Sequence, residues 1–363
     1  METATPQDPP AAHVSSAAWH NARRREILAE FPELRSASKY NSAALFCFAL
    51  PVLNAALALW VGAHSNLLMA LLSAPTLGVW ANQGMAALGH EVCHNTVHPS
   101  LKPTWLKRLM LISIYSWMPG PERHFWLVVL DSNGTHLRHH AKLGQTDIRK
   151  GFDEVDFKAI SGTEIRGKRA LLGLLSSMFM LSARCAAVFL AFQYANGPIA
   201  LIVAWLLWVG PRTLTQLRHK TPFATRIDEV LATSACFSVL FFLSGSHWPL
   251  VYAYLALSAH FQLSSPLHPV AISWRLQHWG TPQVPRSESQ PTFSHYNGWL
   301  WDRFFFFQNY HTEHHDFQYL PHSELRRVRK VASRYYDEAV DARVGVLRII
   351  PKYMRDVWAG GGT

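Results

Sequence analysis

Two long stretches without a charged side chain constrain the fold of this 363-residue chain more than any other feature. Residues 40–90 contain no Asp, Glu, Lys or Arg, and neither do residues 230–274. A helix that crosses the hydrocarbon core of a bilayer needs about 20 apolar residues, so each stretch has room for two spans and a short turn. A soluble helix of such length would carry charges on its exposed face. The pattern therefore predicts an integral membrane protein.

The two stretches are expected to form two helical hairpins. The first would pair Ala43–Ala63 with Leu67–Leu88, and the second would pair Val230–Leu243 with Leu250–Leu267. The segments outside the hairpins are basic and should face the cytoplasm together with both termini, because positive residues are retained on that side. This placement assigns the net charge of +10 to membrane orientation rather than to nucleic-acid binding. The basic segments are Arg23–Arg35, Lys102–Arg108, Arg138–Arg169, Arg212–Arg226 and Arg326–Arg334.

Two further apolar regions are open to more than one interpretation. Residues 105–130 are interrupted by Met118–Arg123, so we expect them to lie in or dip into the membrane interface. Residues 170–211 could also lie at the interface, which we favour, or form another hairpin broken at Gly197-Pro198. An even number of crossings, or none, is required because both flanks are basic.

Eight of the 20 histidines fall into three short clusters. The spacings are HxxxH once and HxxHH twice, and residues three or four positions apart share one face of a helix. Each cluster can therefore direct two or three imidazoles at one point, and neutral imidazole suits iron, copper and zinc. Eight ligands exceed the four that one zinc takes and fit two metal ions that share a site. The clusters are His90 and His94; His136, His139 and His140; and His311, His314 and His315.

The first cluster allows a different interpretation. His90-Glu91-Val92-Cys93-His94 matches HExxH, the zinc metalloprotease motif in which the glutamate acts as general base. An intramembrane protease would place this motif at the end of an apolar helix, as here. Such a protease needs only one further ligand, however, and leaves both HxxHH clusters without a role. Two irons held by imidazoles at a membrane surface instead point to oxygen activation and attack on an unactivated C–H bond.

The same motifs resemble the membrane fatty acid desaturase/hydroxylase superfamily, whose three histidine boxes read HxxxH, HxxHH and HxxHH. Within it, the chain resembles the sphingolipid delta4-desaturase (dihydroceramide desaturase) branch over most of residues 19–340. Arg23–Leu34 is similar to the R-R-x-E-I-L-x-x-Y-P-E-I segment of that branch, and His90–Asn95 to its H-E-x-x-H-N box. Asn309–Phe317 and Val328–Asp337 resemble its third box and the helix that follows.

The resemblance implies an all-α integral membrane protein with about four transmembrane helices, interfacial helices and a cytoplasmic histidine-rich di-iron domain. Residues 1–41 would be a cytoplasmic segment with a basic helix, 42–325 the desaturase-type membrane domain, and 326–363 a basic cytoplasmic tail. Glu91, Asn95 and Glu313 would orient the ligands from a second layer. The expected metal ligands are His90, His94, His136, His139, His140, His278, His311, His314 and His315, of which His278 follows the fourth span.

The implied reaction is an oxygen-dependent dehydrogenation of a lipid chain, most closely a sphingolipid of dihydroceramide type or a fatty acyl chain. Hydroxylation or ketolation on the same scaffold is the alternative, because both begin by removing one hydrogen. The cofactors would be two iron ions, with O2 as co-substrate. Since the chain has no His-Pro-Gly-Gly haem motif, electrons would come from a separate acidic carrier such as cytochrome b5 or a ferredoxin. The protein would reside in the endoplasmic reticulum membrane of a eukaryote or the inner membrane of a bacterium, with its active site facing the cytoplasm.

Some residues are expected to act outside the metal centre. An apolar tunnel between the spans should select the reacting carbon, because a methylene chain offers no polar handle. Phe304–Phe307 is expected to be an aromatic belt at the membrane interface, or alternatively a wall of the substrate site. Gln318–Pro321 departs from the Pro-Asn-Ile-Pro run of the resembled branch, which bears on the substrate. The remaining histidines of interest are expected at surface, buried or supporting positions: His98, His260, His268, His295 and His322.

Overall fold

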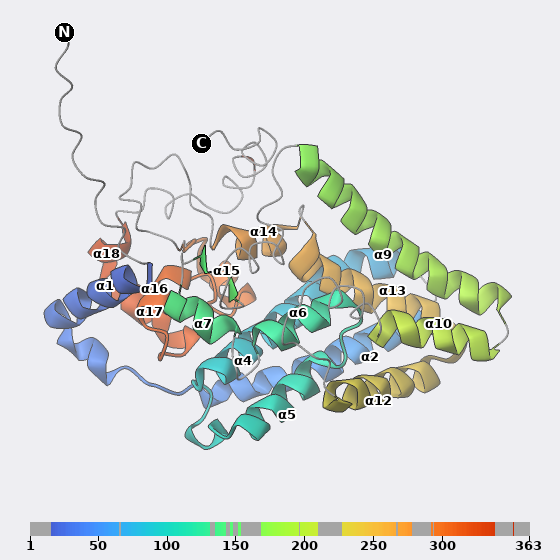
Figure 1. Ribbon diagram of the computed structural model, residues 1–363, viewed down its shortest axis with the longest axis horizontal. Coiled ribbons are helices and arrows are strands. Elements are labelled where there is room, and N and C mark those ends of the chain that lie inside the picture. The colour runs from blue at the N-terminus through green and yellow to red at the C-terminus, as the bar shows by residue number, and fades with distance from the viewer. Residues whose placement is uncertain are drawn as a thin grey trace, which may run out of the picture.

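The structure is a computed structural model, and it is almost entirely helical (Figure 1). Its two short strands, β1 (Thr146–Asp147) and β2 (Phe152–Asp153), pair in antiparallel fashion. The all-α prediction is therefore confirmed for the part of the chain that is described. The described residues are 16–64, 67–130, 135–142, 146–147, 152–153, 168–195, 197–209, 227–265, 268–277, 292, 294–337 and 351.

The first charge-free stretch is helical at both predicted spans. η2 (Ser42–Phe48) continues into α2 (Ala49–Ala63), and together they are long and apolar enough to cross a membrane. The return path consists of α3 (Leu67–Ser73), the π-helical turn η3 (Ala74–Gly78) and α4 (Val79–His94). The widened turn coincides with Pro75, which lacks the N–H that a regular helix requires. α4 continues beyond the predicted end at Leu88 and carries the first histidine cluster.

The second charge-free stretch also forms helices near the predicted positions. They are α12 (Ile227–Ser244), η6 (Gly245–His247), α13 (Trp248–Ala259), η7 (His260–Ser264) and α14 (Pro269–Leu276). Residues 227–274, like η2 and α2 together, are long and apolar enough to cross a membrane. α13 packs against α2, α3 and α4, so the two hairpins form one bundle.

Close contact between α4 and α13 depends on a small residue at the end of η3. A Cβ atom at Gly78 would lie only 2.1 Å from the Ser258 Oγ atom of α13. A larger residue would therefore require the Ser258 side chain or the helices to shift. A buried polar pair ties the bundle together further: the Tyr254 hydroxyl donates to the Asn54 Oδ1 atom of α2 at 3.0 Å. These contacts help to fix the position of α4, and therefore of its histidines, along the bundle.

The two ambiguous apolar regions are helical as well. Residues 105–130 break at the predicted position, between α5 (Thr104–Tyr115) and α6 (Pro121–Val129). α9 (Lys168–Tyr194) and α10 (Gly197–Val209) pack against each other and meet near Gly197-Pro198, where the hairpin alternative placed the turn. α9 also contacts α13, and α10 contacts α12. The helix pair therefore matches the hairpin alternative better than separate helices lying on a membrane surface.

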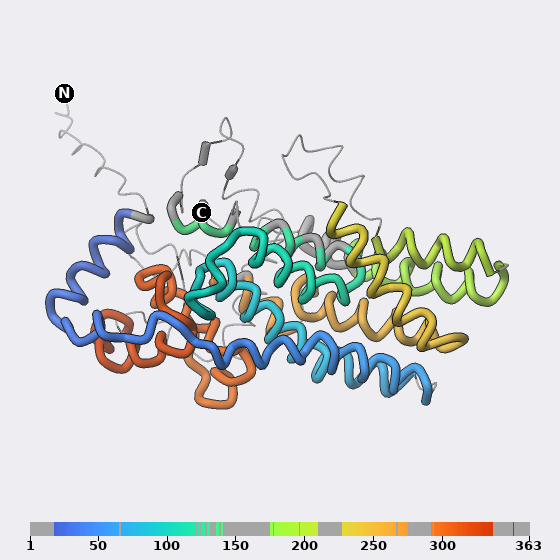
Figure 2. Tube along the Cα trace, turned by 90° about the horizontal axis from the view of Figure 1, so that it is seen from below, coloured from blue at the N-terminus to red at the C-terminus, as the bar shows by residue number. Residues whose placement is uncertain are grey.

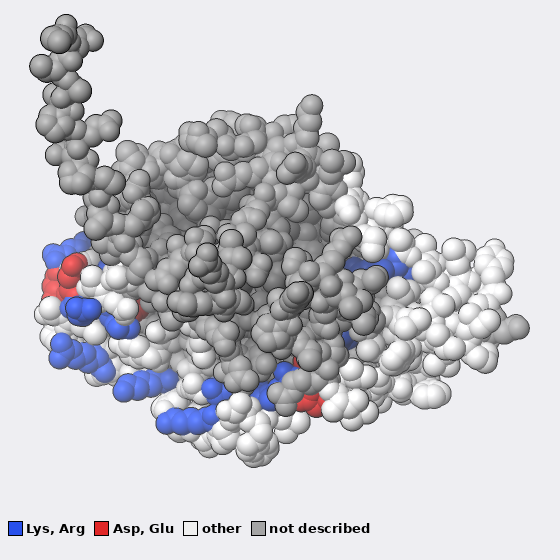
Figure 3. All heavy atoms as spheres, in the orientation of Figure 1, with Lys and Arg blue, Asp and Glu red and all other residues white. Residues whose placement is uncertain are grey.

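The apolar helices extend to one end of the elongated molecule, and the helices with the third histidine cluster occupy the other (Figures 1 and 2). At that other end, α1 (Ser16–Glu30) and η1 (Pro32–Ser36) pack on α16 (His311–Asp316), α17 (His322–Val331) and α18 (Ser333–Asp337) around Ile27, Leu34, Phe317 and Leu325. On the face drawn in Figure 3, Lys and Arg gather over this end, while the far end is almost free of charge. This separation is typical of a protein partly immersed in a bilayer.

The predicted topology can be tested by cysteine labelling. In a variant that lacks the four native cysteines, Ser246→Cys in η6 should react with a membrane-impermeant maleimide only from the non-cytoplasmic side, because the turn joins two spans. Ser36→Cys is the matched control and should react only from the cytoplasmic side. Labelling of both positions from the same side would contradict the four-span arrangement.

Candidate metal centre

The structure gathers the three predicted histidine clusters into two adjoining groups. The first holds His90 and His94 of α4, His136 and His140 of α7 (Thr135–Lys142), and His314 of α16. Within each group the ring nitrogens that could bind a metal lie within 4.8 Å of one another. Each HxxHH cluster contributes to both groups, because its residues point to two sides. The second group is His139, His311 and His315.

Several ring nitrogens are spaced as ligands of a shared ion would be. Nε2 of His140 lies 3.1 Å from that of His136 and 3.0 Å from that of His314. In the second group, Nε2 of His315 lies 3.1 Å from that of His311. Two nitrogens at right angles around a metal, each about 2.1 Å away, are about 3 Å apart. His94 Nε2 is buried and has no hydrogen-bond partner among the described residues. The donor set therefore fits two metal ions.

Burial keeps these imidazoles in the form that binds metal. Removal from water lowers the pKa of His136, His140, His311 and His314 well below the ordinary value of 6.5, and neighbouring histidines lower it further. Neutral imidazole has a free lone pair for coordination, whereas the protonated ring has none. These imidazoles therefore do not have to lose a proton before a metal binds.

The third cluster is held in place by a carboxylate that the sequence did not single out. Asp316, fully buried at the end of α16, accepts hydrogen bonds from His20 Nδ1 at 2.6 Å, Arg23 Nε at 3.0 Å and the Tyr336 hydroxyl at 2.9 Å. The His20 ring in turn lies against His315, with 5.2 Å between ring centroids. α1 is thereby fastened to the metal centre, which explains why a basic N-terminal helix belongs to the site.

Glu313 is buried in the third box but faces away from the two histidine groups. The hydroxyls of Ser294, at 2.5 Å, and of Tyr296 donate to its carboxylate. Burial raises the pKa of Glu313 to about 7, against the lowering effect of these hydrogen bonds. Glu313 belongs to neither histidine group, and its role in orienting the ligands from a second layer stays a prediction.

Asn95 ends α4 in a left-handed conformation with φ of 61°, which asparagine tolerates better than most residues. Its backbone N–H donates to the carbonyl oxygen of Val92 at 3.2 Å. The structure thus gives Asn95 a helix-terminating position directly after His94. Its predicted second-layer role stays a prediction.

Glu91 lies outside both groups, and it contacts His322, which was expected at a supporting or surface position. The backbone N–H of His322 donates to Glu91 Oε1 at 3.0 Å, and the His322 ring stacks on His90 with 4.6 Å between centroids. His322 is buried, and burial lowers its pKa to about 3. A metalloprotease would need Glu91 beside the metal-bound water, so this geometry and the five-histidine group argue against a protease.

Four of the five other histidines expected at surface, buried or supporting positions have partners outside the two groups. His98 contacts Ser100, His268 Nε2 contacts the carbonyl oxygen of Pro75, and Trp301 Nε1 donates to His295 Nδ1. His260 lies 3.8 Å from Glu122. None of these four joins either group. The predicted ligand His278 lies outside the described residues.

The chain is similar to known proteins over most of its length. The model of the fatty acid desaturase family matches residues 65–345. Human sphingolipid delta(4)-desaturase DES1 is 26% identical over 324 residues, which cover 88% of this chain and 83% of that protein. A putative sphingolipid delta(4)-desaturase/C4-monooxygenase of Caenorhabditis elegans is 23% identical over 339 residues, covering 92% of this chain and 78% of that protein. The bovine sphingolipid delta(4)-desaturase/C4-monooxygenase DES2 is 24% identical over 321 residues, covering 88% and 83%. No solved structure gives a significant match.

The division into two groups predicts separable losses of metal. His94→Ala removes a nitrogen from the first group and His311→Ala removes one from the second. Each variant should fall from about two metal ions per chain to about one, because each group can hold its own ion. Elemental analysis of purified protein would measure this. His98→Ala is the control and should keep both ions; loss of both ions in either single variant would show that the groups do not bind independently.

Proposed function

The chain belongs to the fatty acid desaturase family. We propose that it introduces a double bond into the hydrocarbon chain of a sphingolipid of dihydroceramide type. The other proposed substrate is a fatty acyl chain. The observation that carries this proposal is the pair of buried histidine groups formed by α4, α7 and α16. Three curated relatives over most of the chain are named for sphingolipid delta(4)-desaturation, which supports the sphingolipid as the first candidate.

The metal ions of the centre are proposed to be two irons. All eight histidines of the two groups would be ligands, and His278 would be a ninth. Support for His278 comes from its buried neighbour Gln277, whose side-chain amide donates to the carbonyl oxygen of Gln308 at 2.9 Å, three residues before His311. Iron bound there would supply the oxidising power needed to break an unactivated C–H bond.

The overall reaction balances with an external reductant. Two adjacent methylene groups each lose one hydrogen and become a double bond, while O2 takes up these hydrogens together with two electrons and two protons and leaves as two waters. The chain's own residues keep the site dry: every histidine of the second group is nearly inaccessible to solvent. Exclusion of water protects the reacting groups from side reactions.

We propose that the electrons come from an acidic carrier such as cytochrome b5 or a ferredoxin. α17 follows the third histidine cluster and presents Arg326, Arg327 and Lys330 to solvent. α17 lies at the end opposite the apolar helices (Figure 1), and Lys and Arg gather over that end on the face drawn in Figure 3. A positive patch raises the rate of encounter with a negatively charged partner.

Charge reversal tests the carrier surface. The double variant Arg326→Glu/Arg327→Glu should lower the rate of reduction by cytochrome b5 about tenfold at low salt, and the difference should shrink as salt screens the charges. Stopped-flow measurement of carrier oxidation would detect this. Arg25→Glu, a single reversal on α1, is the control and should have a smaller effect. A salt-independent loss would indicate structural damage rather than weakened encounter.

Hydroxylation is the second candidate, because the names of the worm and bovine relatives include C4-monooxygenase activity. Desaturation and hydroxylation share the removal of the first hydrogen and differ in whether a second hydrogen leaves or oxygen is added. The same metal centre could serve both outcomes.

Lipid mass spectrometry of a host that expresses the protein would distinguish the two candidates. Desaturation should yield a sphingolipid lighter by two hydrogen atoms, and hydroxylation one heavier by a single oxygen atom. His314→Ala, which removes a member of the first histidine group, should abolish either product. A lipid profile identical in expressing and control cells would contradict both candidates for the lipids of that host.

A further inference from the structure

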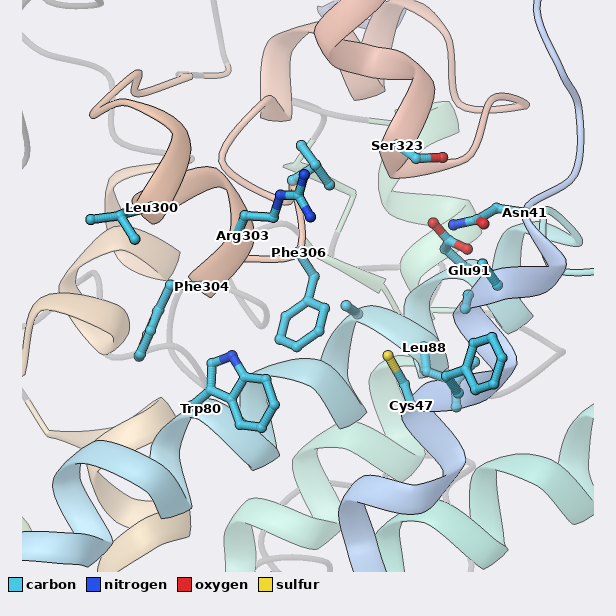
Figure 4. Close-up of a pocket in the computed structure, with 15 residues that line it drawn as sticks. Asn41, Cys47, Trp80, Leu88, Glu91, Leu300, Arg303, Phe304, Phe306 and Ser323 are labelled. Atoms are coloured by element: carbon cyan, nitrogen blue, oxygen red, sulfur yellow. The ribbon is translucent and has the colours of Figure 1, made fainter. Parts of the chain in front are cut away.

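A cleft of about 580 Å³ lies beside the metal centre, between η2, α4, α15 (Trp299–Phe304) and the start of α17 (Figure 4). Its volume falls within the range of roughly 300–1,000 Å³ that is usual for small-molecule sites. The cleft touches no member of the two histidine groups, but Glu91 forms part of its wall directly after His90.

One side of the cleft is an aromatic and aliphatic wall. Trp80 of α4, Phe304 of α15 and Phe306 line it, and the rings of Trp80 and Phe306 lie 5.8 Å apart. Phe306 and Phe307 adopt positive φ angles of 51° and 62°, which bulky residues rarely do. Such backbone strain persists where the surrounding structure enforces it, often at ligand sites.

Gly84 explains how the Phe306 ring reaches its place. A Cβ atom at Gly84 would lie 2.7 Å from Phe306 Cζ and 2.1 Å from Leu50 Cδ1. The absence of a side chain on α4 therefore lets the ring pack closely against that helix. Phe304, Phe306 and Phe307 line the cavity, whereas Phe305 is buried against Val79 and Val270. This arrangement favours the alternative that the run forms a wall of the substrate site.

The opposite end of the cleft is polar. Glu91 and Asn41 point toward one another there, with Ser323 of α17 close by (Figure 4). The backbone N–H of Asn41 donates to the carbonyl oxygen of Thr96 at 2.8 Å, which fixes its position just before η2.

The Glu91 carboxylate has capacity for one more donor. Oε1 accepts the His322 N–H, and the Asn41 side chain also hydrogen-bonds to the buried carboxylate. A carboxylate has about four acceptor sites, so this end of the cleft can still accept a hydrogen bond from a ligand hydroxyl or amide N–H group.

Exposed side chains also line the cleft. Phe46 of η2 and Leu300 of α15 are 83% and 67% exposed, and Arg303 of α15 is an exposed basic residue of the lining. η2 begins the first membrane-spanning segment, so Phe46 would lie at the level where lipid chains begin. The lining therefore combines apolar side chains with polar ones at Asn41, Glu91 and Ser323.

We propose that this cleft binds the lipid substrate, with a hydroxyl or amide group at Asn41, Glu91 and Ser323 and a hydrocarbon chain along Trp80, Phe304 and Phe306. The proposal rests on the proposed function for the identity of the reaction. In this orientation, the polar group of the lipid lies beside Glu91, which follows His90 in the sequence, and the hydrocarbon chain lies along the aromatic wall. The arrangement favours a lipid that carries a hydroxyl or amide group over a plain hydrocarbon chain.

Photo-crosslinking tests occupancy without requiring turnover. The probe is a dihydroceramide that carries a diazirine in its sphingoid chain, added to the purified full-length protein in detergent and mapped by peptide mass spectrometry. Adducts are expected on peptides that contain Trp80 or Phe304–Phe306, and an excess of unlabelled dihydroceramide should suppress them. Adducts confined to other peptides, or adducts that competitor does not suppress, would overturn the proposal.

A filling variant supplies an independent test. Ala44→Trp inserts an indole into the cleft, whereas Val52→Trp places one on the outward side of α2, where Val52 is 57% exposed. Ala44→Trp should reduce crosslinking and kcat/KM at least tenfold with unchanged metal content, and Val52→Trp should change neither. Equal crosslinking in both variants would overturn the proposal that the cleft binds the substrate.

The polar end predicts selectivity. Asn41→Leu should reduce the preference for dihydroceramide over an analogue without the 3-hydroxyl group in competition for crosslinking; an unchanged preference would contradict the polar contact. Failure of the proposed function would look different: suppressible adducts in the cleft but no oxidised lipid product.

Discussion

The mutual burial of eight imidazole rings is the constraint on which the rest of this structure depends. Bringing so many basic groups together away from water is unfavourable unless they stay neutral and share a ligand, and burial lowers their pKa in the required direction. The rings come from three helices that are far apart in the sequence, α4, α7 and α16. Each helix must therefore be held at one height and one rotation, and much of the surrounding structure serves that purpose.

The supports act from both sides of the centre. In the membrane bundle, Gly78 allows α4 to approach α13, and the Asn54–Tyr254 hydrogen bond joins α2 to α13. At the opposite end of the molecule, Asp316 ties α1 and α18 to the third cluster through Arg23 and Tyr336. The N-terminal and C-terminal helices thus belong to the same functional unit as the apolar helices.

Much of the fold and of the metal centre could be predicted from the sequence because both follow from local sequence patterns. Missing charges located the four helices of the hairpins, and i, i+3 and i+4 spacing identified all eight grouped histidines. The spacing could not show how the groups divide, since His139 and His140 are neighbours yet belong to different groups. His20 was missed because its partner Asp316 lies 296 residues away, and no local pattern reports such a contact. The sequence left open whether His322 supports the centre or lies at the surface, and only the folded chain stacks it on His90. The cleft, too, depends on four separate elements and on two strained φ angles, which spacing does not encode.

The central claim is that two irons lie in the two histidine groups, and X-ray absorption at the iron edge of the purified protein tests it most directly. The account predicts about two irons per chain, with a first shell of nitrogen and oxygen atoms and no sulfur, because the ligands would be imidazoles. The same spectrum should change when His94→Ala or His311→Ala removes one ligand. A single tightly bound zinc with iron absent, or an iron spectrum that neither substitution alters, would contradict it.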